Sequence, residues 1–217
     1  MFLKLNIFLV LACFSLLSQA EEFSKDERRI SSEEIWNAKI RPAFFQERDI
    51  LENSAFELKA PERVEDAAVV PVTIKFDAST DLSVKNIYVF IDKNPSPLAG
   101  TFSFPGNAEK ADLALRVRVD DFSYIRAVVE TNEGKLYMSR SFVKAGGGCS
   151  APANAGNIAL LGKIKTRLMG KLKLEQPNLI QLMIKHPNFS GLETAMPGQK
   201  KPEPHFIRKL DVSFEDE

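Results

Sequence analysis

The residue with the clearest capacity for chemistry in this sequence is Cys149, which directly follows Gly146, Gly147 and Gly148. Segment 144–157, which carries the cysteine, contains no large apolar side chain. Such a segment has little to bury, and consecutive glycines give the backbone great freedom. We therefore expect a flexible, solvent-exposed arm with an accessible thiol, whose thiolate form is both a nucleophile and a soft metal ligand.

Three roles are open for this thiol. It can be a reactive group that enters the active site of another protein, half of a disulfide that joins two chains, or an incidental linker residue. The glycine-rich flank favours the first role, because a thiol that enters another protein needs a thin support without bulky side chains. Lys144, a few residues earlier in the chain, would favour the thiolate modestly.

A metal site made of Cys149, His186 and His205 is the main chemical alternative. A copper site with these ligands needs rigid positions, which a run of glycines does not provide. Both histidines adjoin a proline, so we expect them at strand or loop ends, and we expect no metal and no cofactor. The sequence shows no Ser-His-Asp order, phosphate-binding loop or paired-carboxylate motif, so nothing in it indicates an enzyme.

Residues 1–20 have the features of a secretory signal peptide. A lysine near the start precedes an apolar stretch at 5–17, and Ser18-Gln19-Ala20 forms a small-x-small cleavage site. The apolar stretch is shorter than the roughly 20 residues that span a membrane. A lipoprotein modified at Cys13 is the alternative, but the apolar segment continues past that residue. Cleavage after residue 20 leaves Cys149 as the single thiol of an exported chain.

The charge balance excludes a large class of partner. The 217 residues contain 29 basic and 29 acidic side chains, and no run of Lys and Arg interleaves with aromatic residues. Nucleic-acid-binding proteins usually carry a basic patch or stripe. We therefore expect no nucleic-acid partner and, since no segment is long enough to span one, no membrane partner.

A helix is expected first among the elements that position the cysteine. Ser31 and Glu34 have the spacing of a capping box, which predicts that a helix begins there. An apolar stripe suited to packing on a sheet follows at four-residue intervals, at Trp36, Ile40 and Phe44. Pro42 is expected to kink or end this helix.

Beyond residue 55 the apolar period changes to two, which is typical of strands. Alternating segments occur at 69–76, 87–91, 113–119, 124–129 and 136–143. With shorter ones near 56–59 and 102–104, about seven strands separated by turn residues favour an antiparallel immunoglobulin-like sandwich over residues 31–143. The arm at 144–157 would separate this domain from a second one at 160–217.

The second half again has β patterns, at 164–174, 178–184 and 206–214. Its length of about 58 residues is near the lower limit for a domain with its own core. No strand pattern follows the last one, so we expect a domain that is incomplete at its C-terminus, with an exposed edge at 206–214. The expected fold class is mainly β, with two immunoglobulin-like β-sandwich domains, of which the first carries a short N-terminal helix.

Short motifs run through both halves. The first half contains Trp36, Arg48-Asp49, Ala60-Pro61, residues 65–72, Asp92-Lys93-Asn94-Pro95 and the closing Gly147-Gly148-Cys149. The second half contains Ile184-Lys185-His186-Pro187, Ser190-Gly191 and Pro204-His205-Phe206-Ile207. The first set resembles SoxY, the sulfur-binding subunit of the periplasmic thiosulfate-oxidation carrier, and the second set resembles its partner SoxZ. Together they resemble the fused SoxYZ-like carriers that are associated with quinoprotein (PQQ-dependent) alcohol dehydrogenases.

The resemblance implies a periplasmic carrier that is not itself an enzyme. It implies that Cys149 is the covalent attachment site for a sulfur intermediate and that Gly146, Gly147 and Gly148 form a swivel. The implied partners are periplasmic redox enzymes, either Sox-type enzymes or a quinoprotein dehydrogenase with its cytochrome c. The alternative function is a non-catalytic scaffold or binding module for such a dehydrogenase, in which Cys149 is idle or joins two chains in a disulfide dimer.

The arm differs from the family pattern in one respect. The separate SoxY subunit ends shortly after its cysteine and has glycine on both sides of it, whereas here Ser150-Ala151-Pro152 follows and the chain continues. Fourteen extended residues reach about 45 Å, but an arm tethered at both ends projects its cysteine only about half as far. We therefore expect either a partner with a wide cleft or cleavage of the chain after Cys149.

Overall fold

The computed structural model describes residues 27–52, 55–77, 82–108, 111–150, 161–173, 178–195, 197–198 and 200–212. The predicted signal peptide at 1–20 and the part of the predicted arm at 151–157 lie outside these ranges. The chain divides into two compact units, Met1–Gly148 and Cys149–Glu217. No helix within the described ranges is both long enough and apolar enough to cross a membrane.

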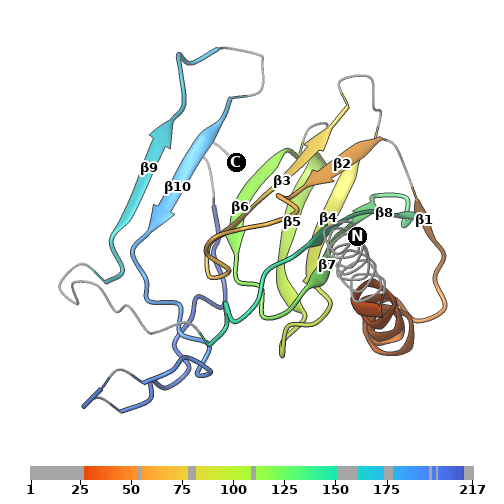
Figure 1. Cartoon of the computed structure of the whole chain (residues 1–217). Helices are drawn as coiled ribbons and strands as arrows, with labels where there is room; N and C mark the ends of the chain where they lie inside the picture. Colours follow the sequence, from red (N-terminus) through yellow and green to blue (C-terminus); the bar gives the residue numbers. More distant parts are fainter. Residues whose placement is uncertain are drawn as a thin grey trace, which may run out of the picture. The chain divides into compact units, whose positions relative to one another are not determined.

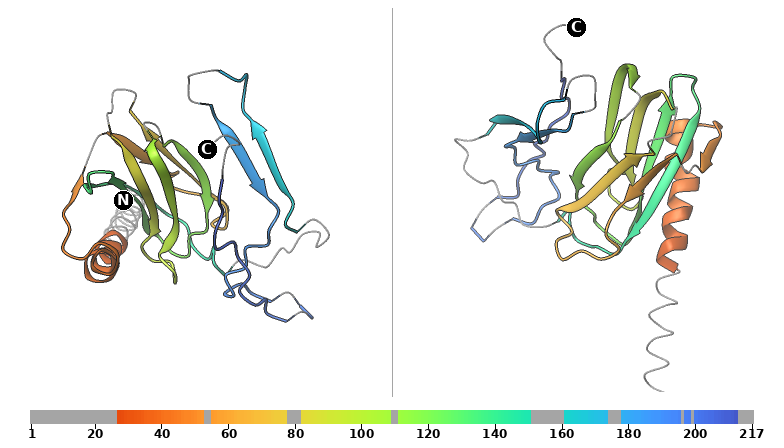
Figure 2. Two further views of the ribbon diagram at one scale, coloured as in Figure 1. Left: turned by 180° about the vertical axis from the view of Figure 1, so that it is seen from behind. Right: turned by 90° about the horizontal axis from the view of Figure 1, so that it is seen from above.

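A helix at the N-terminal side of the first unit packs against a sheet (Figure 2). Residues 27–35 are α-helical, the π-helical turn η1 (Trp36–Ile40) follows, and α2 (Arg41–Phe45) ends the helix. The described helix is already formed at residue 27, so the predicted start at a Ser31 capping box is wrong. Ser31 lies inside the helix, where its neighbours satisfy the backbone without a cap.

The π turn η1 explains how the helix passes Pro42, which is one of the first residues of α2 and has no N–H to donate. In the wider turn, the N–H of Arg41 donates to the carbonyl of Trp36. This turn also inserts one residue into the apolar spacing, so Phe45 is buried and Phe44 is 44% exposed. The predicted stripe is confirmed at Trp36 and Ile40, and it is wrong at Phe44.

Eight strands in the described part of the first unit form two sheets (Figure 1). One sheet has the order β1-β8-β7-β4-β5 and the other has the order β2-β3-β6. The strands are β1 (Ile50–Glu52), β2 (Phe56–Lys59), β3 (Val70–Phe76), β4 (Val84–Ile91), β5 (Leu98–Ala108), β6 (Leu113–Val117), β7 (Ser123–Thr131) and β8 (Leu136–Val143). All neighbours pair antiparallel except β1 with β8. The expected mainly β, immunoglobulin-like fold of this unit is confirmed.

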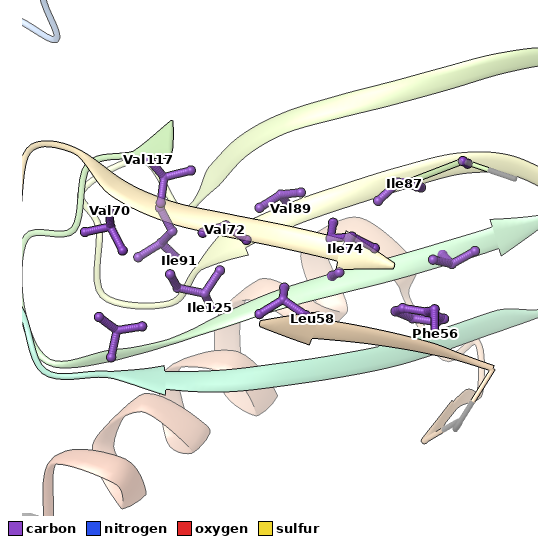
Figure 3. Packing of buried hydrophobic residues seen from close by; sticks show 14 of the residues in the cluster. Phe56, Leu58, Val70, Val72, Ile74, Ile87, Val89, Ile91, Val117 and Ile125 are labelled. Carbon is purple, nitrogen blue, oxygen red and sulfur yellow. The ribbon is translucent and has the colours of Figure 1, made fainter. Parts of the chain in front are cut away.

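The core lies between the two sheets (Figure 3). Strand β3 shows why the period of two was a reliable signal, since Val70, Val72 and Ile74 are buried and the residues between them are not. Strand β7 is instead buried along its whole length except at Tyr124. The helix covers its second face, where Val128 joins a separate apolar cluster with Trp36.

A buried ion pair ties this helix to the sheet. The guanidinium of Arg126 on β7 is fully buried and donates to both carboxylate oxygens of Asp92, with Nε at 3.0 Å from each and Nη2 at 2.9 Å from Oδ2. Helix residues join the pair, because Ser32 Oγ donates to Asp92 Oδ2 at 2.8 Å and Glu33 Oε2 lies 3.0 Å from Arg126 Nη2. The guanidinium also lies 4.7 Å from the centre of the Trp36 ring.

A second polar cluster surrounds Glu130 near the other end of β7. Arg48 Nη2 donates to Oε1 at 3.0 Å, while Asn86 Nδ2 at 3.0 Å and Tyr88 Oη at 2.9 Å donate to Oε2. Burial raises the pKa of Glu130, but the hydrogen bonds from Asn86, Tyr88 and Arg48 outweigh it, so the pKa lies below its ordinary value of 4.5.

The described part of the second unit contains a β-hairpin and loops. Strand β9 (Ile164–Leu168) pairs antiparallel with β10 (Ile180–Ile184), and Phe189 and His205 form an isolated bridge. The strands predicted at 164–174 and 178–184 are therefore present in shorter form. No second sheet accompanies the hairpin among the described residues of this unit.

The strand predicted at 206–214 is wrong for residues 206–212, which have no strand structure, and 213–214 lie outside the described residues. Its apolar side chains do not enter a core, since Phe206 and Leu210 are each 46% exposed and Val212 is 68% exposed. Alternation marks a strand only where a neighbouring strand pairs with the backbone, and the described residues give this segment none.

We predict that Asp92→Ala lowers the free energy of unfolding by about 3–5 kcal/mol, because it leaves the Arg126 charge buried without its main partner. Urea unfolding at neutral pH measures this. The control is Glu57→Ala, which removes an exposed partner of Lys59 and should cost at most about 1 kcal/mol. Equal losses in the two variants would contradict the assigned role of the buried pair.

The lowered pKa of Glu130 predicts an acid-dependent loss of stability. A carboxyl whose pKa is lower in the folded state stabilises the fold above its unfolded pKa, and this contribution disappears as the pH falls through the folded pKa. Glu130→Gln should therefore flatten the fall in unfolding free energy between about pH 5 and about pH 3. Urea unfolding at several pH values tests this, with Glu57→Gln as the control that keeps the wild-type slope.

Candidate functional site

The segment that leads to the cysteine leaves β8 and lies along residues 118–120. The N–H of Gly147 donates to the Asp120 carbonyl at 2.7 Å, and the N–H of Gly148 donates to the Val119 carbonyl at 2.9 Å. Arg118 Nη1 donates to the Gly148 carbonyl at 3.1 Å. The backbone of this part of 144–157 is thus hydrogen-bonded to the sandwich, which differs from the flexible arm that was predicted. Gly146 and Gly147 are exposed, as predicted, whereas Ala145 and Gly148 are buried.

Close backbone packing explains the glycine at position 148. A Cβ atom there would lie 2.1 Å from the Ala67 carbonyl oxygen and 2.6 Å from the Val119 carbonyl oxygen. Gly147 has φ +74, a conformation that favours glycine. At Gly146 the nearest atom to a Cβ would be the Asp120 carbonyl oxygen at 3.6 Å, an ordinary contact. In this conformation Gly147 and Gly148 serve a turn and a close approach rather than a swivel.

Asn94 holds the backbone on which the glycines lie. Its Nδ2 donates to the Arg118 carbonyl at 2.8 Å, and its Oδ1 accepts the N–H of Asp120 at 2.9 Å. From the other side, the Ala67 carbonyl accepts the N–H of Val119 at 2.9 Å. This role of Asn94 leaves no signal in the sequence, because its two partners lie more than twenty positions away in the chain.

Lys144 does not serve the thiol as predicted. Its Nζ lies 2.8 Å from Glu62 Oε1, and its N–H donates to the Glu62 carbonyl at 2.7 Å. The side chain is only 11% exposed, so its charge is compensated within the sandwich. The cation next to the cysteine-bearing backbone is instead Arg118, which directly follows β6.

Cys149 begins the second unit as a thiol that is only 7% exposed. The prediction of an accessible thiol is therefore wrong for this conformation. The next residue is also held, because the Ser150 carbonyl accepts the N–H of Thr194 at 3.1 Å and its Oγ1 at 2.9 Å. A reaction of Cys149 inside another protein thus requires some of these hydrogen bonds to open.

The two histidines of the metal alternative lie together in the loops of the second unit. The His186 and His205 rings meet edge to face with centres 4.6 Å apart. The Nδ1 atom of His186 accepts the N–H of Asn188 at 3.0 Å. Within the described residues, no group of three or more His, Cys, Asp or Glu is placed to hold a metal ion.

Glu193 organises the same loops and was not singled out in the sequence. It is fully buried, and its carboxylate accepts the N–H of Ser190 at 2.7 Å and the N–H of Gly191 at 2.9 Å. Burial raises the pKa of Glu193, but these bonds and that from Ser190 Oγ outweigh it and lower the pKa. Gly191 has φ +84 and would clash with Pro204 if it carried a Cβ. Two of the predicted motifs, Ser190-Gly191 and Pro204-His205, are therefore in contact.

Comparison with known proteins gives one family. Residues 41–149 match the family described as "Sulfur oxidation protein SoxY", and the matched span ends on Cys149. Among solved structures, the sulfur carrier protein SoxY from Chlorobium limicola f thiosulfatophilum is 32% identical over 52% of this chain and 97% of that chain, with a TM-score of 0.44. A superoxide reductase (neelaredoxin) from Ignicoccus hospitalis is 19% identical over 42% and 81%, with a TM-score of 0.32. No curated protein matches the chain.

The geometry at Gly148 predicts that Gly148→Ala makes Cys149 more reactive. The new Cβ would force the segment away from Ala67 and Val119. Overpacking of about 1–3 kcal/mol corresponds to an increase of about 5-fold to about 150-fold in the open population. The rate of reaction with a disulfide reagent measures this. Gly146→Ala, where the added Cβ makes an ordinary contact, should change the rate by less than about twofold. Equal rates in the two variants would show that the close approach does not control the thiol.

Proposed function

The chain belongs to the SoxY family of sulfur oxidation proteins, and from this we propose that Cys149 is the residue to which a sulfur intermediate is attached. SoxY is a sulfur carrier and not a catalyst, so the chain has a carrier role and is not an enzyme. The observation that carries the assignment to Cys149 is its position. Cys149 is the last residue of the span that matches the family, and among the described residues it is the one cysteine.

Thiol chemistry suits this role. In thiol–disulfide exchange, the Cys149 thiolate attacks one sulfur of a donor disulfide or persulfide and releases the other sulfur as a thiolate. The S–S bond that forms on Cys149 replaces the one that breaks, so no external oxidant is consumed. A second thiolate that attacks the adduct reverses the step and returns Cys149 as a thiolate. The carrier role therefore needs a thiolate that is buried in one state of the protein and accessible to a partner enzyme in another.

The hydrogen bonds around the cysteine supply the sheltered state. While Gly147 and Gly148 are bonded to residues 119–120, Cys149 is buried and its thiol is kept from solvent. Release of these bonds frees a glycine run, and Gly146, Gly147 and Gly148 then act as the swivel. We propose that a partner enzyme captures this released state. Since the chain continues beyond Cys149, the partner must admit a looped segment through a wide cleft, unless the chain is cleaved there.

We propose that the protein works in the periplasm with redox enzymes. The signal-like residues 1–20 support export, and the SoxZ-like motifs of the second unit support a fused SoxYZ-like carrier. Its partners would be Sox-type enzymes, or a quinoprotein dehydrogenase with its cytochrome c. A scaffold for such a dehydrogenase, with Cys149 idle or in a disulfide dimer, is the alternative that the following experiment separates.

The carrier proposal predicts a sulfur adduct on Cys149 in the native protein. Intact-mass and peptide-mass measurement of protein from cells grown on thiosulfate or on an alcohol should show persulfide or thiosulfonate additions on that residue. Cys149→Ser should lack them and fail to support growth, while its urea-unfolding midpoint stays close to wild type. Wild-type growth with Cys149→Ser, or a native protein found only as thiol or symmetric dimer, would contradict carriage and favour the scaffold.

A further inference from the structure

The hairpin of the second unit has two chemically different faces. The register between β9 and β10 places Ile164, Leu168 and Ile180 on one face, and all three are exposed. The other face is cationic. On β9 this face carries Lys165 and Arg167, which pair with Met183 and Gln181 of β10. Lys163 directly precedes β9 and Lys185 directly follows β10. We call these four cations the basic face: Lys163, Lys165, Arg167 and Lys185.

The charges of the basic face are not neutralised within the described part of the chain, where none of its four side chains has a carboxylate partner. Of the acids described in the second unit, Glu193 is buried and bonded to its own loop, Asp211 pairs with Lys209, and Glu203 is exposed. Two cations even lie directly across from each other, because the N–H of Lys185 donates to the Lys163 carbonyl at 2.9 Å. Like charges in opposite positions of a ladder destabilise it.

The edge beside these cations is open. Among the described residues, β9 pairs with one strand, β10 (Figure 1). All five residues of β9 are exposed. Alternate residues of a strand are about 6.6–6.8 Å apart, so carboxylates at every second position of an added strand would match the spacing of Lys163, Lys165 and Arg167. An added strand would also satisfy the outward backbone groups of β9.

We propose that the open edge of β9 binds an extended acidic segment of a partner protein as a third strand. Carboxylates at alternate positions would lie beside the basic face, and apolar residues between them would extend the opposite face with Ile164 and Leu168. The face carries no aromatic side chain on which a nucleotide base could stack, which argues against single-stranded nucleic acid. Edge lysines also discourage aggregation, but a single inward charge serves that purpose, whereas four cations attract a counter-charge.

The test uses the full chain and a labelled peptide in which Glu and Val alternate, with a block peptide of the same composition as its control. Fluorescence anisotropy should show saturable binding of the alternating peptide that weakens with salt. Changing Lys163, Lys165, Arg167 and Lys185 together to Gln should weaken binding at least about tenfold. The matched variant changes Lys171, Lys173, Lys200 and Lys201 to Gln and should weaken binding less than about threefold.

Several outcomes would overturn the proposal. Equal binding of the block peptide, or an equal loss in the matched variant, would mean general charge attraction without strand addition. Tighter binding of single-stranded DNA or of phosphatidylglycerol vesicles through the same four residues would identify a different class of partner. Aggregation of the basic-face variant without peptide binding by the wild type would leave the lysines as edge protection only. Cys149→Ser should bind the peptide as wild type does, so this test is independent of the carrier proposal.

Discussion

The position of the cysteine depends on the buried pair of Arg126 and Asp92. Asp92 begins the turn after β4, and its carboxylate is fixed from below by Arg126 and from the helix by Ser32. Two residues further on, Asn94 binds the backbone of 118–120, which in turn carries Gly147 and Gly148. The buried pair thus fixes the turn whose Asn94 binds the backbone to which Gly147 and Gly148 are hydrogen-bonded. This connection explains why a polar network lies on a face that apolar residues alone could fill.

The segment before Cys149 is held by hydrogen bonds that are individually weak, and this decides how easily the thiol becomes accessible. The bonds from Gly147, Gly148 and Arg118 each contribute about 0.5–1.5 kcal/mol net, so together they hold the closed state by only a few kcal/mol. No large apolar side chain adds to them between Ala145 and Cys149. The hydrogen-bonded state is therefore the more populated one. A partner that binds only the open segment can shift the population to the open state if its binding free energy exceeds these few kcal/mol.

Local patterns in the sequence predicted local structure, and they failed where a distant residue decides. The period of two located β3 and β6, where alternate residues are buried, and it also located β7 and β8. The burial of the second face of β7 was not predicted, because it comes from the helix that covers it. The shift from Phe44 to Phe45 was hidden because it follows from how Pro42 is accommodated. A glycine run is compatible with a flexible segment and with close backbone packing. At Gly148 the carbonyl groups of Ala67 and Val119 make it a site of close packing, and both lie far away in the sequence. Likewise, residues 206–212 alternate as a strand does, but the described residues offer no neighbouring strand.

The two flanks of Cys149 are held in different ways, and this decides how the thiol is released. On one side, glycines are bonded to the first unit. On the other side, the Ser150 carbonyl accepts two bonds from Thr194 within the second unit. The side that gains most conformational entropy on opening is the glycine side, because Gly has the widest choice of backbone conformations. We therefore expect the bonds of Gly147 and Gly148 to open before those of Ser150, so that the swivel lies before the cysteine rather than after it.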